Sequence, residues 1–133
     1  TFGGGRRDVY FRDTSTHLLD GINSTNVRWL LQNSSNATIQ NSTFEYNFSG
    51  TLYSFFPITS SGTVLVDGNT VRSVGSGIGV HRGFNVYGAA TVAPTISNNS
   101  IENMAMGMLL EADPTPTVTN NTFLNCTVDT QQN

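Results

Sequence analysis

The chain uses one six-residue phrase four times, and this repeat restricts the possible folds more than any other feature. The copies are Ile39–Phe44, Val66–Val71, Ile96–Ile101 and Val118–Phe123. Each copy begins and ends with a large apolar residue, and Thr or Ser stands just before the last residue. The last residues of successive copies are 27, 30 and 22 positions apart. A fixed phrase with insertions of variable length indicates stacked units whose connecting turns differ.

Residue preferences favour strands over helices in these units. The phrases are rich in Thr, Val, Ile, Phe and Asn, which suit strands and turns better than helices. This composition argues against ankyrin and tetratricopeptide repeats, and the dense leucine pattern of leucine-rich repeats is missing. The sequence therefore predicts an all-β, single-domain parallel β-helix (β-solenoid) of about four to five coils, each laid on the coil before it.

Asn stands just before the Thr or Ser in three copies of the phrase, and Ser42 takes its place in the first. With this pattern the phrase resembles the parallel, right-handed β-helix repeat of the pectate-lyase-like superfamily, over roughly residues 26–128. The resemblance implies a ladder of inward-turned asparagines, one per coil. Its members would be Asn69, Asn99 and Asn121. Stacked amides supply each other with donors and acceptors, so Ser42 would leave the ladder short, whereas Asn103, outside the phrase, is expected to be replaceable.

Three further expectations concern the order of the elements. A glycine-rich lead-in at residues 1–7 precedes the β-helix domain at 8–128, and residues 129–133 form a C-terminal tail. Pro57 cannot donate to a strand ladder, so it is expected to mark the edge of the aromatic-rich strand before it. The long stretch 81–94 is expected to project from the stack as a loop.

A shared glycine decides between strand and helix after the third copy. Gly50, Gly77 and Gly107 each stand six residues after the end of a phrase, and each begins an apolar-rich run. The spacing of Met104 and Met108 also fits an amphipathic helix. The common position of the glycines favours a strand between residues 101 and 112.

Residues suited to chemistry are sparse. Enzymes of the resembling fold use a Lys or Arg base or clustered carboxylates, but this chain has no Lys and its acids are scattered singly. We therefore expect no catalytic site and no enzyme activity. The two histidines are far apart and lack a Cys partner, so no metal site and no cofactor are expected. His81 and Arg82 are candidate contacts at the start of the long loop, although a solvated turn is the simpler interpretation.

Composition excludes several classes of partner. Charged residues make up 11% of the chain, the net charge is −3, and no basic patch is visible, so nucleic acid is not an expected partner. No apolar run reaches membrane-spanning length, so membrane insertion is not expected. The lone Cys126 is expected to be a buried thiol. Solubility must come from the 15 Asn, 13 Ser and 18 Thr, or from groups attached to them.

Eight asparagines lie in the acceptor sequence for N-linked glycans. They are Asn23, Asn33, Asn36, Asn41, Asn47, Asn98, Asn120 and Asn125. A chain so rich in Asn, Ser and Thr forms some of these sequons by chance, and two of them come with the repeated phrase. The cluster between Asn23 and Asn47 is denser than composition requires. In an organism that glycosylates, it predicts an extracellular or cell-surface glycoprotein.

Two classes of function remain open. The first is a non-catalytic extracellular structural or adhesive β-solenoid, a subunit of a surface assembly or filament that self-associates or joins further β-helix coils. The second is a carbohydrate-binding or polysaccharide-active β-helix fragment, similar to a lyase, epimerase or glycosidase, with Tyr53, Phe55 and Phe56 as a platform for sugars. An ice-binding solenoid is a third, remote option. Its flat threonine row would comprise Thr38, Thr95 and Thr117.

Overall fold

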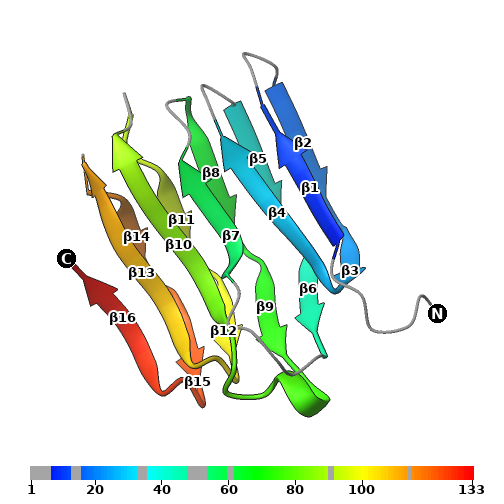
Figure 1. Ribbon diagram of the computed structural model, residues 1–133. Helices are drawn as coiled ribbons and strands as arrows, with labels where there is room; N and C mark the ends of the chain where they lie inside the picture. The colour runs from blue at the N-terminus through cyan, green and yellow to red at the C-terminus, as the bar shows by residue number, and fades with distance from the viewer. Residues whose placement is uncertain are drawn as a thin grey trace.

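Three parallel sheets run along the molecule and enclose its core (Figure 1). The computed structural model describes residues 7–12, 16–32, 36–47, 54–59, 62–89, 92–113 and 115–133, without the side chains of 54–57, 59, 88–89 and 112–113. Sheet A consists of β1 (Arg7–Phe11), β4 (Val27–Gln32), β7 (Ser54–Thr59), β10 (Arg82–Ala89), β13 (Met106–Asp113) and β16 (Val128–Gln132). Sheet B consists of β2 (Thr16–Asp20), β5 (Asn36–Gln40), β8 (Val64–Asp67), β11 (Thr95–Ser97) and β14 (Thr117–Thr119). Sheet C consists of β3 (Asn23–Thr25), β6 (Thr43–Tyr46), β9 (Thr70–Ser73), β12 (Ser100–Glu102) and β15 (Thr122–Leu124).

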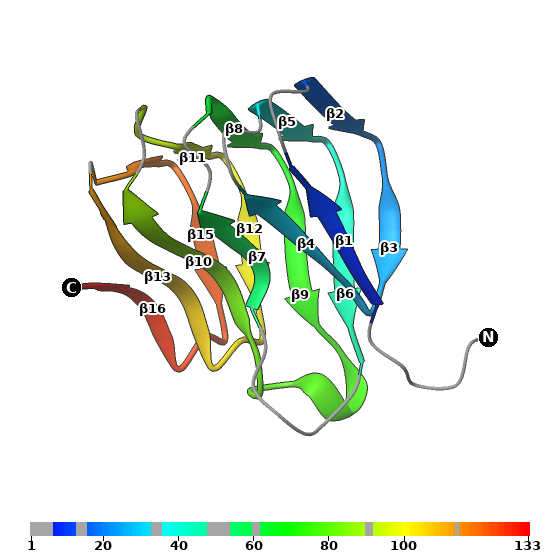
Figure 2. The ribbon, with the colours of Figure 1, turned by 45° about the horizontal axis from the view of Figure 1, so that its top comes forward.

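The chain passes through sheets B, C and A in turn before it begins the next coil (Figure 2). After β1, the described residues form five such coils, from β2–β3–β4 to β14–β15–β16. Every strand from β1 to β13 pairs in parallel with the equivalent strand of the next coil, and the first and last strands lie at opposite ends of the stack. This confirms the predicted all-β parallel β-helix of four to five coils. It also confirms strands, β12 and β13, where the sequence allowed a helix.

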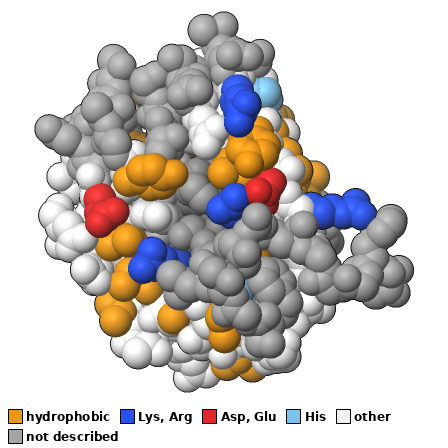
Figure 3. Space-filling view, viewed as in Figure 1, with side chains coloured by type: hydrophobic (Ala, Val, Ile, Leu, Met, Phe, Trp, Pro, Cys, Tyr) orange, Lys and Arg blue, Asp and Glu red, His pale blue; other side chains and the backbone are white. Residues whose placement is uncertain are grey.

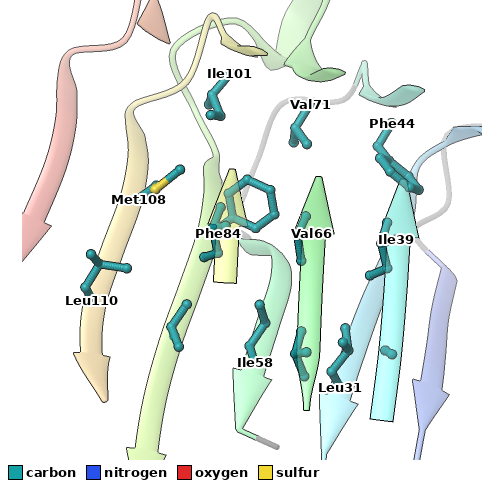
Figure 4. Packing of buried hydrophobic residues seen from close by; sticks show 14 of the residues in the cluster. Leu31, Ile39, Phe44, Ile58, Val66, Val71, Phe84, Ile101, Met108 and Leu110 are labelled. Carbon is teal, nitrogen blue, oxygen red and sulfur yellow. The ribbon is translucent and has the colours of Figure 1, made fainter. Parts of the chain in front are cut away.

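Apolar side chains from successive coils stack in rows inside the three sheets. Phe44, Val71 and Ile101 form such a row in sheet C, because strand pairing places them side by side (Figure 4). Ile39 and Val66 continue the same arrangement in sheet B, and all five side chains are fully buried. Each buried side chain of this size contributes about 1.5–3 kcal/mol. The opening and closing residues of the repeated phrase are therefore the ones that hold the stack together.

The stretch 81–94 does not project as a loop, because most of it is β10 in the middle of sheet A. Arg82 pairs with Ser54 of β7 on one side and with Met106 of β13 on the other. The extra residues of this coil lie earlier, in a 3-10 turn at Gly75–Gly77 and the turn after it, at the bottom of Figure 2. The insertion is thus accommodated before the chain rejoins the sheet.

The same insertion changes the glycine register. Because Phe84 pairs with Met108, Gly83 rather than Gly77 lies opposite Gly107. A Cβ atom on Gly83 would lie 2.5 Å from the carbonyl oxygen of Gly107, so both positions require the close approach that glycine allows. Gly50 lies outside the described residues.

Two other expectations also differ from the structure. Pro57 lies inside β7, and the pairing of this strand with β4 begins at the next residue, Ile58, so the missing N–H interrupts no ladder on that side. Residues 129–132 of the expected tail belong to β16, which pairs with β13 and extends sheet A. At the other end, β1 begins at Arg7, and residues 1–6 of the lead-in lie outside the described part of the chain.

Candidate functional site

Stacked side-chain amides hold the corner between sheets B and C. The side-chain oxygen of Asn99 accepts hydrogen bonds from the backbone N–H of Asn69 at 2.9 Å and from its side-chain amide at 3.0 Å. Asn121 accepts the same pair from Asn99, at 3.0 and 2.9 Å. Each amide also donates to a backbone carbonyl of the coil before it, as Asn99 does to Val66. Each buried amide thereby links three coils.

Ser42 continues this stack instead of leaving it short. Its backbone N–H donates to the side-chain oxygen of Asn69 at 3.0 Å, and its hydroxyl donates to the carbonyl of Gln40 at 2.7 Å. The same hydroxyl accepts from the backbone N–H of Ile22 at 2.9 Å, one coil earlier. A hydroxyl can both donate and accept, so it replaces the amide at this position. Ile22 then ends the polar stack towards the N-terminus.

Asn103 is not the replaceable residue that the sequence suggested. Its backbone has a left-handed φ of 59°, its side-chain amide donates to the carbonyl of Ser73 at 3.1 Å, and its oxygen accepts from Asn125 at 3.3 Å. It therefore supports the second corner, between sheets C and A. The signal in the sequence is an Asn two residues after the phrase, present in the third and fourth copies.

The first residue of each corner between sheets B and C has a left-handed backbone. The five residues, in order of the coils, are Gly21, Asn41, Gly68, Asn98 and Asn120, with φ between 50° and 66°. Glycine and asparagine are the residues that adopt this conformation at least cost. Three of the eight sequon asparagines, Asn41, Asn98 and Asn120, are therefore exposed along one edge of the solenoid.

The other sequon asparagines lie elsewhere. Asn23 is exposed on sheet C, and Asn47 and Asn125 are exposed at the corner between sheets C and A. Asn36 is half-buried and accepts a hydrogen bond from the N–H of Thr63 at 2.9 Å. Asn33 lies outside the described residues. None of the seven that the structure describes lies within a strand of sheet A.

His81 and Arg82 do not form a loop contact. His81 is completely buried, and its ring meets that of Tyr46 edge to face with centroids 5.1 Å apart. Its carbonyl oxygen accepts from the backbone N–H of Ala105 at 2.8 Å. Arg82 is the first residue of β10 and not part of a projecting segment. His81 is thus a core residue that helps to bring the chain back into sheet A.

Several carboxylates join neighbouring coils. Asp8 pairs with Arg28 at 2.7 Å, and Glu45 pairs with Arg72 at 2.8 Å. Asp67 accepts hydrogen bonds from Ser97 and then from Asn98, and these contacts lower the pKa of its carboxyl. On the face of the molecule that Figure 3 shows, charged side chains are scattered among apolar and neutral ones and do not form one patch. In the described part of the chain, no group of three or more His, Cys, Asp or Glu residues could hold a metal ion.

The structure describes the whole threonine row suggested for ice binding, but not the aromatic platform suggested for sugars. Thr38, Thr95 and Thr117 lie in one outward row of sheet B, with Leu65 between the first two. Leu18, which is 66% exposed, takes the first position of that row. Tyr53 and the side chains of Phe55 and Phe56 lie outside what the structure describes.

The two ends of the stack differ in how they are covered. At the N-terminal end, the ring of Phe11 stacks on that of His17 with centroids 4.5 Å apart and lies 5.9 Å from that of Trp29. These rings close the core over Phe44, which meets Trp29 edge to face. At the other end, every residue of β16 is exposed. Val118, Phe123 and Cys126 pack against the core there but remain partly accessible.

Comparison with known proteins identifies the repeat. A sequence model of the family described as "right handed beta helix region" matches residues 25–131. No curated protein and no solved structure matches the chain. No helix in the described residues is long and apolar enough to cross a membrane.

Proposed function

Because the chain belongs to the right-handed β-helix family, we propose that it is a non-catalytic structural or adhesive β-solenoid at the cell surface. Its contact face is the last described coil, β14–β15–β16, and its partner is a further β-helix coil, either of a second copy or of a continuing chain. The observation that carries this proposal is the partly exposed apolar cross-section of that coil.

Main-chain groups give this face its binding capacity. Among the described residues, β14, β15 and β16 are each the last strand of their sheet and have a neighbour on one side. Such edges present backbone N–H and C=O groups that pair readily with another strand. Val118 and Phe123, partly exposed between these edges, add apolar surface to the contact.

The amide ladder supports continuation in the same direction. Asn69 and Asn99 each donate a backbone N–H and an amide hydrogen to the asparagine of the next coil. Asn121 is the last described member of the ladder. Its amide donates to the carbonyl of Ile96 on the preceding coil and to that of Thr119 on its own coil. A strand stacked on this coil with an acceptor at the same place would repeat the pattern.

The charged residues support a structural role. Asp8, Glu45 and Asp67 are each engaged with a residue of a neighbouring coil, and Asp20 likewise accepts from Gln40. These contacts stabilise the stack. The alternative of a carbohydrate-active fragment requires carboxylates aimed at a substrate.

The test combines solution mass with activity on polysaccharides. Unglycosylated protein of residues 1–133 is studied by sedimentation equilibrium over a range of concentrations, and is incubated with pectate and alginate. We expect the mass to rise above that of the monomer with concentration, with no cleavage products. A strict monomer at high concentration would overturn the assembly, and cleavage would favour the carbohydrate-active alternative.

A matched pair of variants locates the contact. Phe123→Lys places a charge on the exposed cross-section, whereas Leu124→Lys places it on the outer face of the same strand, where Leu124 is 54% exposed. We expect only the first to abolish association. Thermal melting of both variants, followed by circular dichroism, separates loss of contact from loss of folding. Equal association of the two variants would place the contact elsewhere.

A further inference from the structure

We infer that Asn41 and Asn98 carry N-linked glycans, which stand two coils apart on the corner between sheets B and C. The inference rests on the proposed extracellular location, because only there is this modification expected. It selects two of the eight sequons from their geometry in the folded protein.

Both asparagines are exposed, and their hydroxyl residues are half-buried on the outer face of sheet C. Asn41 and Asn98 are exposed, with φ of 50° and 56°. The second residue of the corner turns inward, and the third, Thr43 or Ser100, begins the next strand. Thr43 and Ser100 lie in one outward row of sheet C, alternating with the buried row of Phe44 and Ile101. The folded corner can therefore hold a sugar without displacing core residues.

An aspartate of the preceding coil orients each acceptor amide. The side-chain nitrogen of Asn41 donates to Asp20 at 3.0 Å, and that of Asn98 donates to Asp67 at 2.7 Å. In glycosylation, this nitrogen attacks the anomeric carbon of a lipid pyrophosphate-linked oligosaccharide. The bond from that carbon to the pyrophosphate oxygen breaks, the lipid pyrophosphate leaves with the electron pair, and the amide loses one proton. The second amide hydrogen remains and can still donate to the aspartate.

The neighbouring coils leave room for each glycan. The corner position one coil earlier is Gly21 below Asn41 and Gly68 below Asn98, so on that side the aspartate is followed by a residue without a side chain. Two coils separate the acceptors, a distance of about 10 Å at the usual strand spacing. Asn120 has the same backbone conformation, but its neighbour one coil earlier is Asn98 and not a glycine. We therefore exclude it from the pair.

The test uses the whole chain secreted from a glycosylating host, with occupancy measured by glycopeptide mass spectrometry. We expect glycans on Asn41 and Asn98. Thr43→Val and Ser100→Ala remove the sequons but keep the corner asparagines, so each should remove one glycan from the intact mass. Thr70→Val is the matched control, because Thr70 lies between these residues in the same row and its corner residue is Gly68. It should change no glycan.

Two outcomes would overturn the inference. One is that Asn41 and Asn98 are bare while other sequons of the secreted, folded protein are occupied. The other is that Asn120 is occupied as fully as Asn98, because the glycine neighbour would then have no influence. Association through the last coil is measured on unglycosylated protein, so either proposal can fail without the other.

Discussion

The side-chain oxygen of Asn121 accepts two hydrogen bonds from Asn99, one from its backbone N–H at 3.0 Å and one from its side-chain amide at 2.9 Å. Asn99 receives the same pair from Asn69. Asn99 is therefore held from both sides, and it is only 1% exposed. Removal of its side chain takes hydrogen bonds from Asn69 and Val66 of the preceding coil and from Asn121 of the following one.

We expect Asn99→Ala to lower the free energy of unfolding by about 1–3 kcal/mol, the usual cost of leaving buried polar groups unpaired. Asn23→Ala, at an exposed position of β3, should change it by less than about 0.5 kcal/mol. Urea unfolding of both variants measures the difference. Equal losses would contradict the role of the ladder.

Gly107→Ala should destabilise the protein through a steric clash. A Cβ atom there would lie 2.5 Å from the carbonyl oxygen of Asp129 and 2.6 Å from the ring of Phe123. Overpacking of this kind costs about 1–3 kcal/mol. Gly68→Asn is the control, because its φ of 66° suits asparagine and a Cβ would meet only ordinary contact at 3.5 Å. Thermal unfolding should give a clearly lower melting temperature for Gly107→Ala than for Gly68→Asn.

Acid should weaken the corner between sheets B and C. Hydrogen bonds from Gln40 and then Asn41 lower the pKa of Asp20, and those from Ser97 and then Asn98 lower the pKa of Asp67, both from the usual 3.8. A carboxyl with a lowered pKa binds its proton more weakly in the folded state. Its stabilising effect is therefore complete above pH 3.8 and is lost as the pH falls through the lowered pKa.

Urea midpoints measured at several pH values test this dependence. In the wild-type protein, we expect the urea concentration at the midpoint to decrease as the pH is lowered below 3.8. The fall should be smaller in a variant with both Asp20→Asn and Asp67→Asn, which lacks the two titrating groups. If the urea midpoint of that variant falls with pH as steeply as that of the wild type, the acid sensitivity belongs to other carboxyls.

Cys126 should react slowly at neutral pH. Burial raises the pKa of its thiol above the usual 9.0, so little of the reactive thiolate is present. We expect the reaction with a disulfide reagent to be faster in denaturant than in buffer, and to accelerate with pH. Fast reaction of the native protein at pH 7 would show that the last coil opens readily. Comparison at low and high protein concentration would also report whether association covers this coil.

Of all parts of the fold, the corner between sheets B and C was the one best predicted from the sequence. That corner has only two residues, one with a left-handed backbone and one turned inward, so the same residue types recur in each coil. The expectation for Ser42 was wrong because a hydroxyl, like an amide, can both donate and accept a hydrogen bond. The predicted resemblance to right-handed β-helix repeats is confirmed by the family match over residues 25–131.

The part of each coil that leads from sheet C into sheet A was harder to predict, because its number of residues differs between coils. The extra residues before β10 moved the glycine register from Gly77 to Gly83, and they placed His81 in the core. No periodic pattern marks where such an insertion ends. Asn103 was missed because its contacts are with Ser73 and Asn125 of neighbouring coils, which local spacing does not specify.

The ladder contacts connect residues 20, 27, 30 and 22 positions apart, yet each contact spans a single coil. The length of the solenoid along its axis therefore depends on the number of coils and not on the number of residues, and each coil adds about 4.8 Å. Duplication of one corner phrase with its strands would lengthen the rod by one step. Addition of residues at the turn around Gly75–Gly77 would widen one coil and leave this length unchanged.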